Sequence, residues 1–170
     1  MSIIKEVRGF TPEFGKDCYF AETSIIIGNV KAGDQCSFWF NSVVRGDVNS
    51  IRLGNKVNVQ DGAVIHCTYE RAATEIGNNV SIGHNALVHG CTIADNVLVG
   101  MGSIIMDLAE VQSEVLIAAG SVVLEKTVLE SGHLYAGTPA RKIKKLDTRL
   151  FEGEVMRIAK NYIKYSSWYK

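Results

Sequence analysis

The chain has 170 residues, with 18 Lys plus Arg against 18 Asp plus Glu, so its formal net charge is zero. A chain of this length is expected to form one domain with a substantial core, and its even charge balance argues against a nucleic-acid-binding protein that works through bulk positive charge. No apolar run approaches the roughly 20 residues that cross a bilayer, which excludes a transmembrane helix.

The N-terminal segment, residues 1–6, has no basic start, apolar middle or small-residue cleavage site, so we expect a cytoplasmic protein. The four cysteines form no CxxC pair. Because a cytoplasmic chain of this size does not need a disulfide framework, we expect them to be reduced thiols.

The dominant signal in the sequence is a period of six residues. Such a period fits neither the 3.6 residues of a helix nor the 2 residues of a half-buried strand. It is typical of short strands joined by tight corners, in which three hexads form a triangular coil and stacked coils bury one column of apolar residues. The predicted column consists of Ile26, Ala32, Phe38, Val44, Leu53, Val59, Ile65, Ile76, Ile82, Val88, Ile93, Val99, Ile105, Val111, Ile117, Val123 and Leu129.

The period breaks at three places. The spacing is nine in 44–53, eleven in 65–76 and five in 88–93. Inserted residues must bulge outward as loops, where functional side chains are often found. Between the strands, Asn residues are expected at corners that need left-handed backbone. These are Asn55, Asn78, Asn79 and Asn96.

A C-terminal helix follows the repeats, which stop after residues 135–139. Asp147 is a typical N-cap, and the apolar residues beyond it recur at spacings of 3 and 4. The sequence therefore predicts an all-β, parallel β-helix domain over 1–142 and an amphipathic helix over 147–170. We expect this helix to pack on the β-helix or on a neighbouring subunit.

The register of the coils places Arg45, His66 and His89 in one vertical row, since each directly follows a column residue. His66 and His89 are 23 residues apart, of which five belong to an insertion, leaving the 18 residues of one coil. Arg45 and His66 are 21 apart, of which three are inserted, which again leaves 18. Cys67 and Cys91 are out of phase with these histidines, and we interpret them as packing residues.

His84 follows the column residue Ile82, one hexad before the column residue of His89, so it belongs to a different face. Its neighbour one coil below is Asp61, beside Gln60. Two half-sites thus lie on two faces of one chain, and a threefold trimer that packs one face against the next would bring them together. Three imidazoles with an open fourth position are the ligand set of a catalytic zinc, although iron and cobalt also accept them.

These residues resemble the γ-class carbonic anhydrase family of hexapeptide-repeat proteins over nearly the whole chain. The resemblance implies a left-handed β-helix and a homotrimer in which His66 and His89 of one subunit and His84 of the next bind zinc. It also implies attack of zinc hydroxide on CO2 to give bicarbonate, a lyase reaction. The motifs that carry the resemblance are Arg45-Gly46-Asp47, Asn58-Val59-Gln60-Asp61-Gly62, His66, Gly83-His84, Leu87-Val88-His89-Gly90-Cys91 and Gly137-Thr138-Pro139-Ala140.

The same resemblance implies roles for the polar residues of these motifs. Gln60 would hydrogen-bond the metal-bound water or bicarbonate, and Asn58 would help to orient it. Arg45 and Asp47 would form an intersubunit ion pair that supports the site, although two residues apart on a strand they also suit a surface salt bridge. Tyr162 on the terminal helix is a candidate for lining the pocket.

The loops differ from those of the family prototype, which has an extended acidic loop after the Arg-Gly-Asp stretch. Residues 47–50 are short and contain no glutamate. In the second loop, 68–74, Glu70 is our hypothesis for proton transfer, based on its position in the loop.

Three functions remain open at this point. The first is CO2 hydration, the second is zinc-dependent hydrolysis of an acyl-CoA thioester or another small acyl substrate, and the third is a metal-stabilised trimer without hydration activity. An acetyltransferase is less expected, because hexapeptide transferases normally use a single catalytic histidine and more coils or loops to hold the acyl donor.

Overall fold

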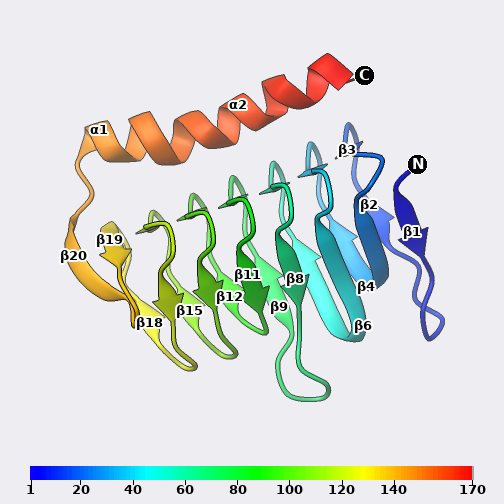
Figure 1. Ribbon diagram of the computed structural model, residues 1–170, viewed down its shortest axis with the longest axis horizontal. Coiled ribbons are helices and arrows are strands. Elements are labelled where there is room, and N and C mark those ends of the chain that lie inside the picture. The colour runs from blue at the N-terminus through cyan, green and yellow to red at the C-terminus, as the bar shows by residue number, and fades with distance from the viewer. Residues whose placement is uncertain (170) are drawn as a thin grey trace.

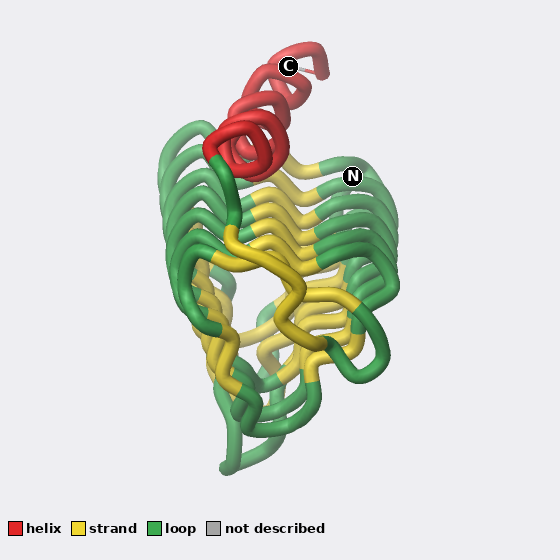
Figure 2. Tube along the Cα trace, turned by 90° about the vertical axis from the view of Figure 1, so that its left-hand side faces the viewer, coloured by secondary structure: helices red, strands yellow, loops and turns green. Residues whose placement is uncertain are grey.

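The computed structural model describes residues 1–169 as a triangular prism of stacked coils. Short strands repeat along the long axis (Figure 1), and the coils overlie one another when viewed down that axis (Figure 2). The predicted fold class is confirmed: the chain is a parallel β solenoid of about seven turns with a C-terminal helix.

One side of the prism, which we call the helical face, is a sheet of its own. Its parallel strands are β3 (Tyr19–Phe20), β5 (Ser37–Phe38), β7 (Asn58–Val59), β10 (Ser81–Ile82), β13 (Leu98–Val99), β16 (Leu116–Ile117) and β19 (His133–Ala136). The sheet ends on β20 (Arg141–Lys145), which runs antiparallel to β19. The sequence period gave no sign of this last strand, because β20 leaves the coil path.

The other two sides form a second sheet, because β4 (Ile25–Ala32) and β6 (Val43–Leu53) are long enough to pass around a corner. The start of β6 pairs with β8 and its end pairs with β9. The histidine face contains β8 (Val64–His66), β11 (Leu87–His89), β14 (Ile104–Ile105) and β17 (Val122–Val123). The third face contains β9 (Thr74–Ile76), β12 (Thr92–Ile93), β15 (Glu110–Val111) and β18 (Val128–Leu129). Strands β1 (Ile3–Lys5) and β2 (Glu13–Phe14) pair with β4.

The core is the predicted apolar column. Every residue of that column is buried, with at most 8% of its surface exposed. Backbone pairing stacks column residues directly on one another, as in the series Ile65, Val88 and Ile105. Since each fully buried aliphatic side chain contributes about 1.5–3 kcal/mol, this repeated burial is the main stabilising contribution that the sequence makes visible.

At one corner of the prism, successive coils have a glycine followed by Asp or Asn, as in Gly33-Asp34, Gly54-Asn55 and Gly77-Asn78. Oδ1 of Asn78 accepts a hydrogen bond from the amide of Asn55 in the coil below, at 2.9 Å. A Cβ on Gly54 would lie 2.8 Å from that same Oδ1, so glycine leaves the room that the next coil's side chain needs. The prediction of left-handed backbone is correct for Asn79 and Asn96.

That prediction is wrong for Asn55 and Asn78, where the left-handed conformation is absent among the positions described. It falls instead on the residues that follow them, Lys56 and Asn79, with φ of 58° and 54°. The side chains of Asn55 and Asn78 point to the coil below, where each accepts a hydrogen bond from a backbone amide. Asparagine is therefore used at these two positions for its acceptor oxygen and not for its tolerance of positive φ.

The C-terminal helical segment begins at the predicted cap. Oδ1 of Asp147 accepts a hydrogen bond from the amide of Leu150 at 2.8 Å. The segment comprises α1 (Thr148–Leu150), a π-helical part η1 (Phe151–Met156), α2 (Arg157–Ser166) and a 3-10 turn η2 (Ser167–Tyr169). Residue 170, with which the predicted helix ends, lies outside the described residues.

This segment runs back along the prism over the helical face (Figures 1 and 2). Val155 is fully buried against Leu98 and Leu116, and Tyr162 packs edge-on to Trp39. The terminal helix thereby covers the strand ends that carry one half of the predicted site. Within residues 1–169, no helix is long and apolar enough to span a membrane.

Candidate metal centre

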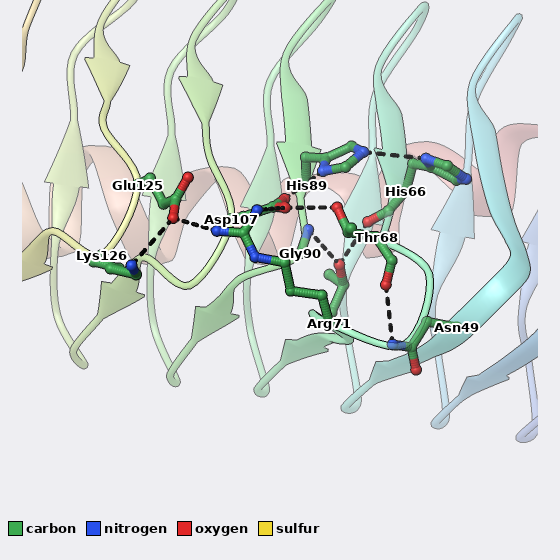
Figure 3. A network of polar contacts seen from close by, with 10 residues as sticks. Asn49, His66, Thr68, Arg71, His89, Gly90, Asp107, Glu125 and Lys126 are labelled. Carbon is green, nitrogen blue, oxygen red and sulfur yellow. Dashed lines mark hydrogen bonds and ion pairs between the residues drawn. The ribbon is translucent and has the colours of Figure 1, made fainter.

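Two of the predicted ligands lie side by side on the histidine face. Strands β8 and β11 pair in register, and each ends on a histidine, His66 and His89. Nδ1 of His66 and Nε2 of His89 are 3.1 Å apart, with the two rings turned toward each other (Figure 3). Two nitrogens bound to one tetrahedral zinc at the usual bond length would be about 3.3 Å apart. The pair therefore fits two positions of such a site with little adjustment.

A carboxylate contacts the outer nitrogen of each of these rings. Oδ1 of Asp47 lies 3.1 Å from Nε2 of His66, and Oδ1 of Asp107 lies 2.5 Å from Nδ1 of His89. Because an ionised carboxylate only accepts hydrogen bonds, the outer nitrogen carries the proton and the inner nitrogen of a neutral ring keeps its lone pair. Two lone pairs then face each other, an arrangement that is favourable only with a cation or a proton between them.

The electrostatics of this half-site favour a neutral His66 ring and charged carboxylates on Asp47 and Asp107. Burial lowers the pKa of His66, which keeps the imidazole neutral at neutral pH. Burial raises the pKa of Asp47 and Asp107, but the hydrogen bonds that they accept, from Arg45 and His66 and from Thr68 and His89 respectively, bring both below the usual value. These are the protonation states that a metal site needs.

The third predicted ligand, His84, follows β10 on the helical face. Its Nδ1 is 2.9 Å from Oδ2 of Asp61, and its Nε2 is 3.3 Å from the hydroxyl of Tyr162. Burial raises the pKa of Tyr162 to about 12, so the phenol is protonated and can donate to that nitrogen. As in the other two rings, a carboxylate leaves one nitrogen of His84 free of a proton.

The amides predicted to support the reaction form a short buried chain beside His84. Nε2 of Gln60 donates to Oδ1 of Asn58 at 2.9 Å, and Nδ2 of Asn58 donates to the hydroxyl of Ser81 at 2.8 Å. Gln60, His84 and Tyr162 line one end of a cavity of about 440 Å³ between the helical face and α2. Asn58 thus fixes the orientation of the Gln60 amide, which reaches the cavity.

The two half-sites are on different faces of the prism, as the register predicts. Within residues 1–169, no group of three or more His, Cys, Asp or Glu side chains is arranged to hold a metal. A single chain therefore presents two of the predicted ligands, His66 and His89, on one face and the third, His84, on another. Cys67 and Cys91 are buried in the core, in keeping with their interpretation as packing residues.

Of the remaining predicted residues, Arg45 and Asp47 are fixed by contacts with other side chains, and Glu70 is not. Arg45 forms an ion pair with Asp47 within the chain, and the Arg45 side chain is 42% exposed. Glu70 is exposed at the tip of its loop with φ of 50°, and it makes no hydrogen bond or ion pair within residues 1–169. The structure thus joins Arg45 and Asp47 to His66, and it leaves Glu70 unattached.

Sequence reasoning missed Asp107, although its carboxylate touches His89. Asp107 stands two places after Ile105, so the register does not place it above a histidine. The coil over 88–93 is one residue short, and Gly90 at that corner leaves the space into which the carboxylate fits. The spacing of five instead of six in 88–93 was the sign in the sequence that the register changes beside His89.

Comparison with known proteins identifies the class first. Residues 73–107 match the family model described as bacterial transferase hexapeptide (six repeats). The crystal structure of a hexapeptide transferase family protein from Anaplasma phagocytophilum superposes with a TM-score of 0.94 at 35% identity, covering 99% of this chain and 98% of that one. The molecule is a hexapeptide-repeat β-helix protein.

Two relatives define the family within that class. A carbonic anhydrase of Geobacillus kaustophilus is 34% identical, over 99% of this chain and 91% of the relative. The mitochondrial γ carbonic anhydrase 2 of Arabidopsis thaliana is 38% identical over 90% of this chain, which spans 56% of the plant protein's length. The chain belongs to the γ-class carbonic anhydrase family.

Proposed function

We propose that this protein is a metal-dependent, γ-type carbonic anhydrase that works as a homotrimer. His66 and His89 of one subunit and His84 of the next would hold zinc, with iron or cobalt as the other metals that this donor set accepts. The observation that carries the proposal is the set of three histidines, each with a carboxylate beside one ring nitrogen, which would leave the other nitrogen without a proton and able to bind metal. This is the usual arrangement of histidine ligands in metalloproteins.

The proposed CO2 hydration depends on ligands that carry no charge, because they would leave the metal its full positive charge. His66, His84 and His89 would hold the zinc, and the bound metal would supply a nucleophile from water near neutral pH, suited to attack on CO2. Gln60, held by Asn58, presents its amide to the reacting oxygen atoms or to bicarbonate. Tyr162 lines the cavity beside His84, and its hydroxyl contacts Nε2 of His84, a hydrogen bond that metal binding at this nitrogen would replace.

The other predicted residues support the site or move a proton. Arg45 holds Asp47, and Asp47 orients His66, so this pair supports the ligands. The exposed end of Arg45 is available to a neighbouring subunit. Glu70 is the loop carboxylate proposed to pass a proton to solvent, and because it has no hydrogen-bond or ion-pair partner among residues 1–169, it can exchange with water.

Metal content and CO2 hydration, measured on the same preparation, test this proposal. We expect about one divalent metal per chain and hydration above the buffer rate. His66→Ala should lose both, whereas the control His133→Ala should keep both, since His133 contacts a backbone carbonyl at the end of the prism. A preparation with full metal content and no hydration would reject the anhydrase and leave the metal-dependent hydrolase and the metal-stabilised trimer.

The cavity beside His84 favours a second candidate function, hydrolysis of a thioester or another small acyl compound. Its volume of about 440 Å³ is far more than CO2 needs and lies in the usual range for organic ligands. Leu98, Met101, Leu116 and Ile158 give it an apolar lining. Metal-dependent release of thiol from short-chain acyl-CoA would support this function, and hydration without any such release would exclude it.

A further inference from the structure

Asp107 lies at the corner that follows β14, one coil beyond His89. Its side chain is only 13% exposed, and its Oδ1 is 2.5 Å from Nδ1 of His89. This is the shortest contact that a carboxylate makes to any of the three proposed ligands in the described chain. Asp107 belongs to none of the motifs that identify the family.

The second oxygen of Asp107 is fixed from the inserted loop. The hydroxyl of Thr68 donates to Oδ2 at 2.5 Å, and the guanidinium of Arg71 lies 3.8 Å from the same atom (Figure 3). Arg71 is itself held by an ion pair with Glu125 one coil further on. Both carboxylate oxygens therefore have partners, which restricts rotation of the side chain.

The backbone around the two histidines is shaped to admit this carboxylate. Gly90 adopts φ of 53°, and a Cβ at this position would lie 2.6 Å from Oδ1 of Asp107. The hydroxyl of Thr74 accepts from the Gly90 amide at 3.0 Å and donates to the carbonyl of His66 at 2.6 Å. The loop thus ties together the ends of both histidine strands and the carboxylate beside them.

We propose that Asp107 is a positioning residue of the metal centre, which fixes His89 as the tautomer protonated on Nδ1 and aims its Nε2 at His66. Thr68 acts through Asp107 by holding Oδ2. The effect on metal affinity rests on the proposed function, whereas the effect on the tautomer does not, because it belongs to the metal-free protein. The carboxylate partner of a ligand histidine commonly changes metal affinity by about 10–100-fold.

The tautomer can be read without metal, from long-range ¹H–¹⁵N correlations of the imidazoles in the metal-free protein. The chain has 4 histidines, so single His→Gln variants assign the signals. We expect His89 to be protonated on Nδ1 in the parent and to shift toward the Nε2 tautomer in Asp107→Ala. A parent His89 that carries a proton on Nε2 and none on Nδ1, or an unchanged tautomer in Asp107→Ala, would overturn the proposal.

Metal affinity is measured by titrating Co²⁺ against a chromogenic chelator. Asp107→Ala should weaken binding about 10–100-fold and change the visible spectrum of bound cobalt, and Thr68→Val should weaken it less. The matched control is Asp95→Ala, because the Asp95 carboxylate also accepts hydrogen bonds from a neighbouring coil, from the amide and the side chain of Asn78, but touches no histidine. Equal affinities in Asp107→Ala and the control would refute the effect on metal binding.

The two measurements separate this proposal from the proposed function. If the parent binds no Co²⁺, the metal-dependent function fails while the tautomer measurement still decides whether Asp107 positions His89. If Asp107→Ala does not fold, Thr68→Val still tests the link, because it removes one hydrogen bond and leaves the carboxylate in place. An unchanged Co²⁺ affinity and tautomer in Thr68→Val would then count against the proposal.

Discussion

The division of the metal centre between two subunits can be tested by mixing two inactive variants. His66→Ala removes a ligand from the histidine face, and His84→Ala removes the ligand of the helical face. Because His66 and His84 lie on different faces of one chain, each variant alone should form trimers without an intact site. After the two are unfolded, mixed in equal amounts and reassembled, some junctions should regain all three ligands.

The expected recovery follows from threefold symmetry. A junction is intact only where a His84→Ala chain supplies His66 and His89 and its neighbour, a His66→Ala chain, supplies His84. One junction in each mixed trimer meets this condition, and three quarters of randomly assembled trimers are mixed. About a quarter of all sites should therefore recover.

Metal content per chain and CO2 hydration are the measurements, with native mass spectrometry to verify that mixed trimers have formed. A mixture of His66→Ala with His89→Ala is the matched control. Both of these substitutions damage the same half-site, so no junction should recover. Absence of metal in verified mixed trimers of the first pair would refute the divided site, because ligands drawn from one chain could not be restored by mixing.

Four further predictions concern stability and proton transfer. Ile105→Ala, at a fully buried column position, should lower the free energy of unfolding in urea by about 2–5 kcal/mol, whereas Ile104→Ala, next to it but partly exposed, should cost less than half as much. Asp147→Ala should cost about 1 kcal/mol in the same assay, since it removes the helix cap. The pKa of Asp47 is lower in the folded chain than in the unfolded chain, so the ionised side chain stabilises the fold fully above about pH 4, and this contribution is lost as the pH falls below that value. In Asp47→Asn, the free energy of unfolding should therefore fall less steeply between neutral and acid pH than in the parent. Glu70→Gln should slow CO2 hydration at low buffer concentration and not at high concentration, and equal rates at every buffer concentration would remove Glu70 from the proton path.

The fold could be predicted because one physical requirement repeats along the chain. Each coil must bury an apolar side chain on each face, so the column from Ile26 to Leu129 is visible as a period of six. The cap at Asp147 could be predicted for the same kind of reason, since it depends on local geometry alone. Strand β20 and the π-helical part of the terminal segment could not, because neither repeats and both depend on contacts with distant residues.

The positions of several candidate site residues could also be predicted from the register of the coils. It placed His66 beside His89 and put His84 on another face, because positions one coil apart in a solenoid are neighbours in space. It did not give the directions of side chains. For example, the carboxylate of Asp47 contacts both Arg45 and His66. These two contacts depend on how β6 passes around its corner.

The contact between Asp107 and His89 shows where the periodic argument stops. A strict period would place Met106 above His89, since Val88 pairs with Ile105. The carboxylate reaches the ring because the corner over 88–93 is one residue short and has Gly90 where a side chain would collide with it. A solenoid sequence therefore predicts its site best where the repeat is regular, and the departures from the repeat mark the positions where side chains from different coils meet.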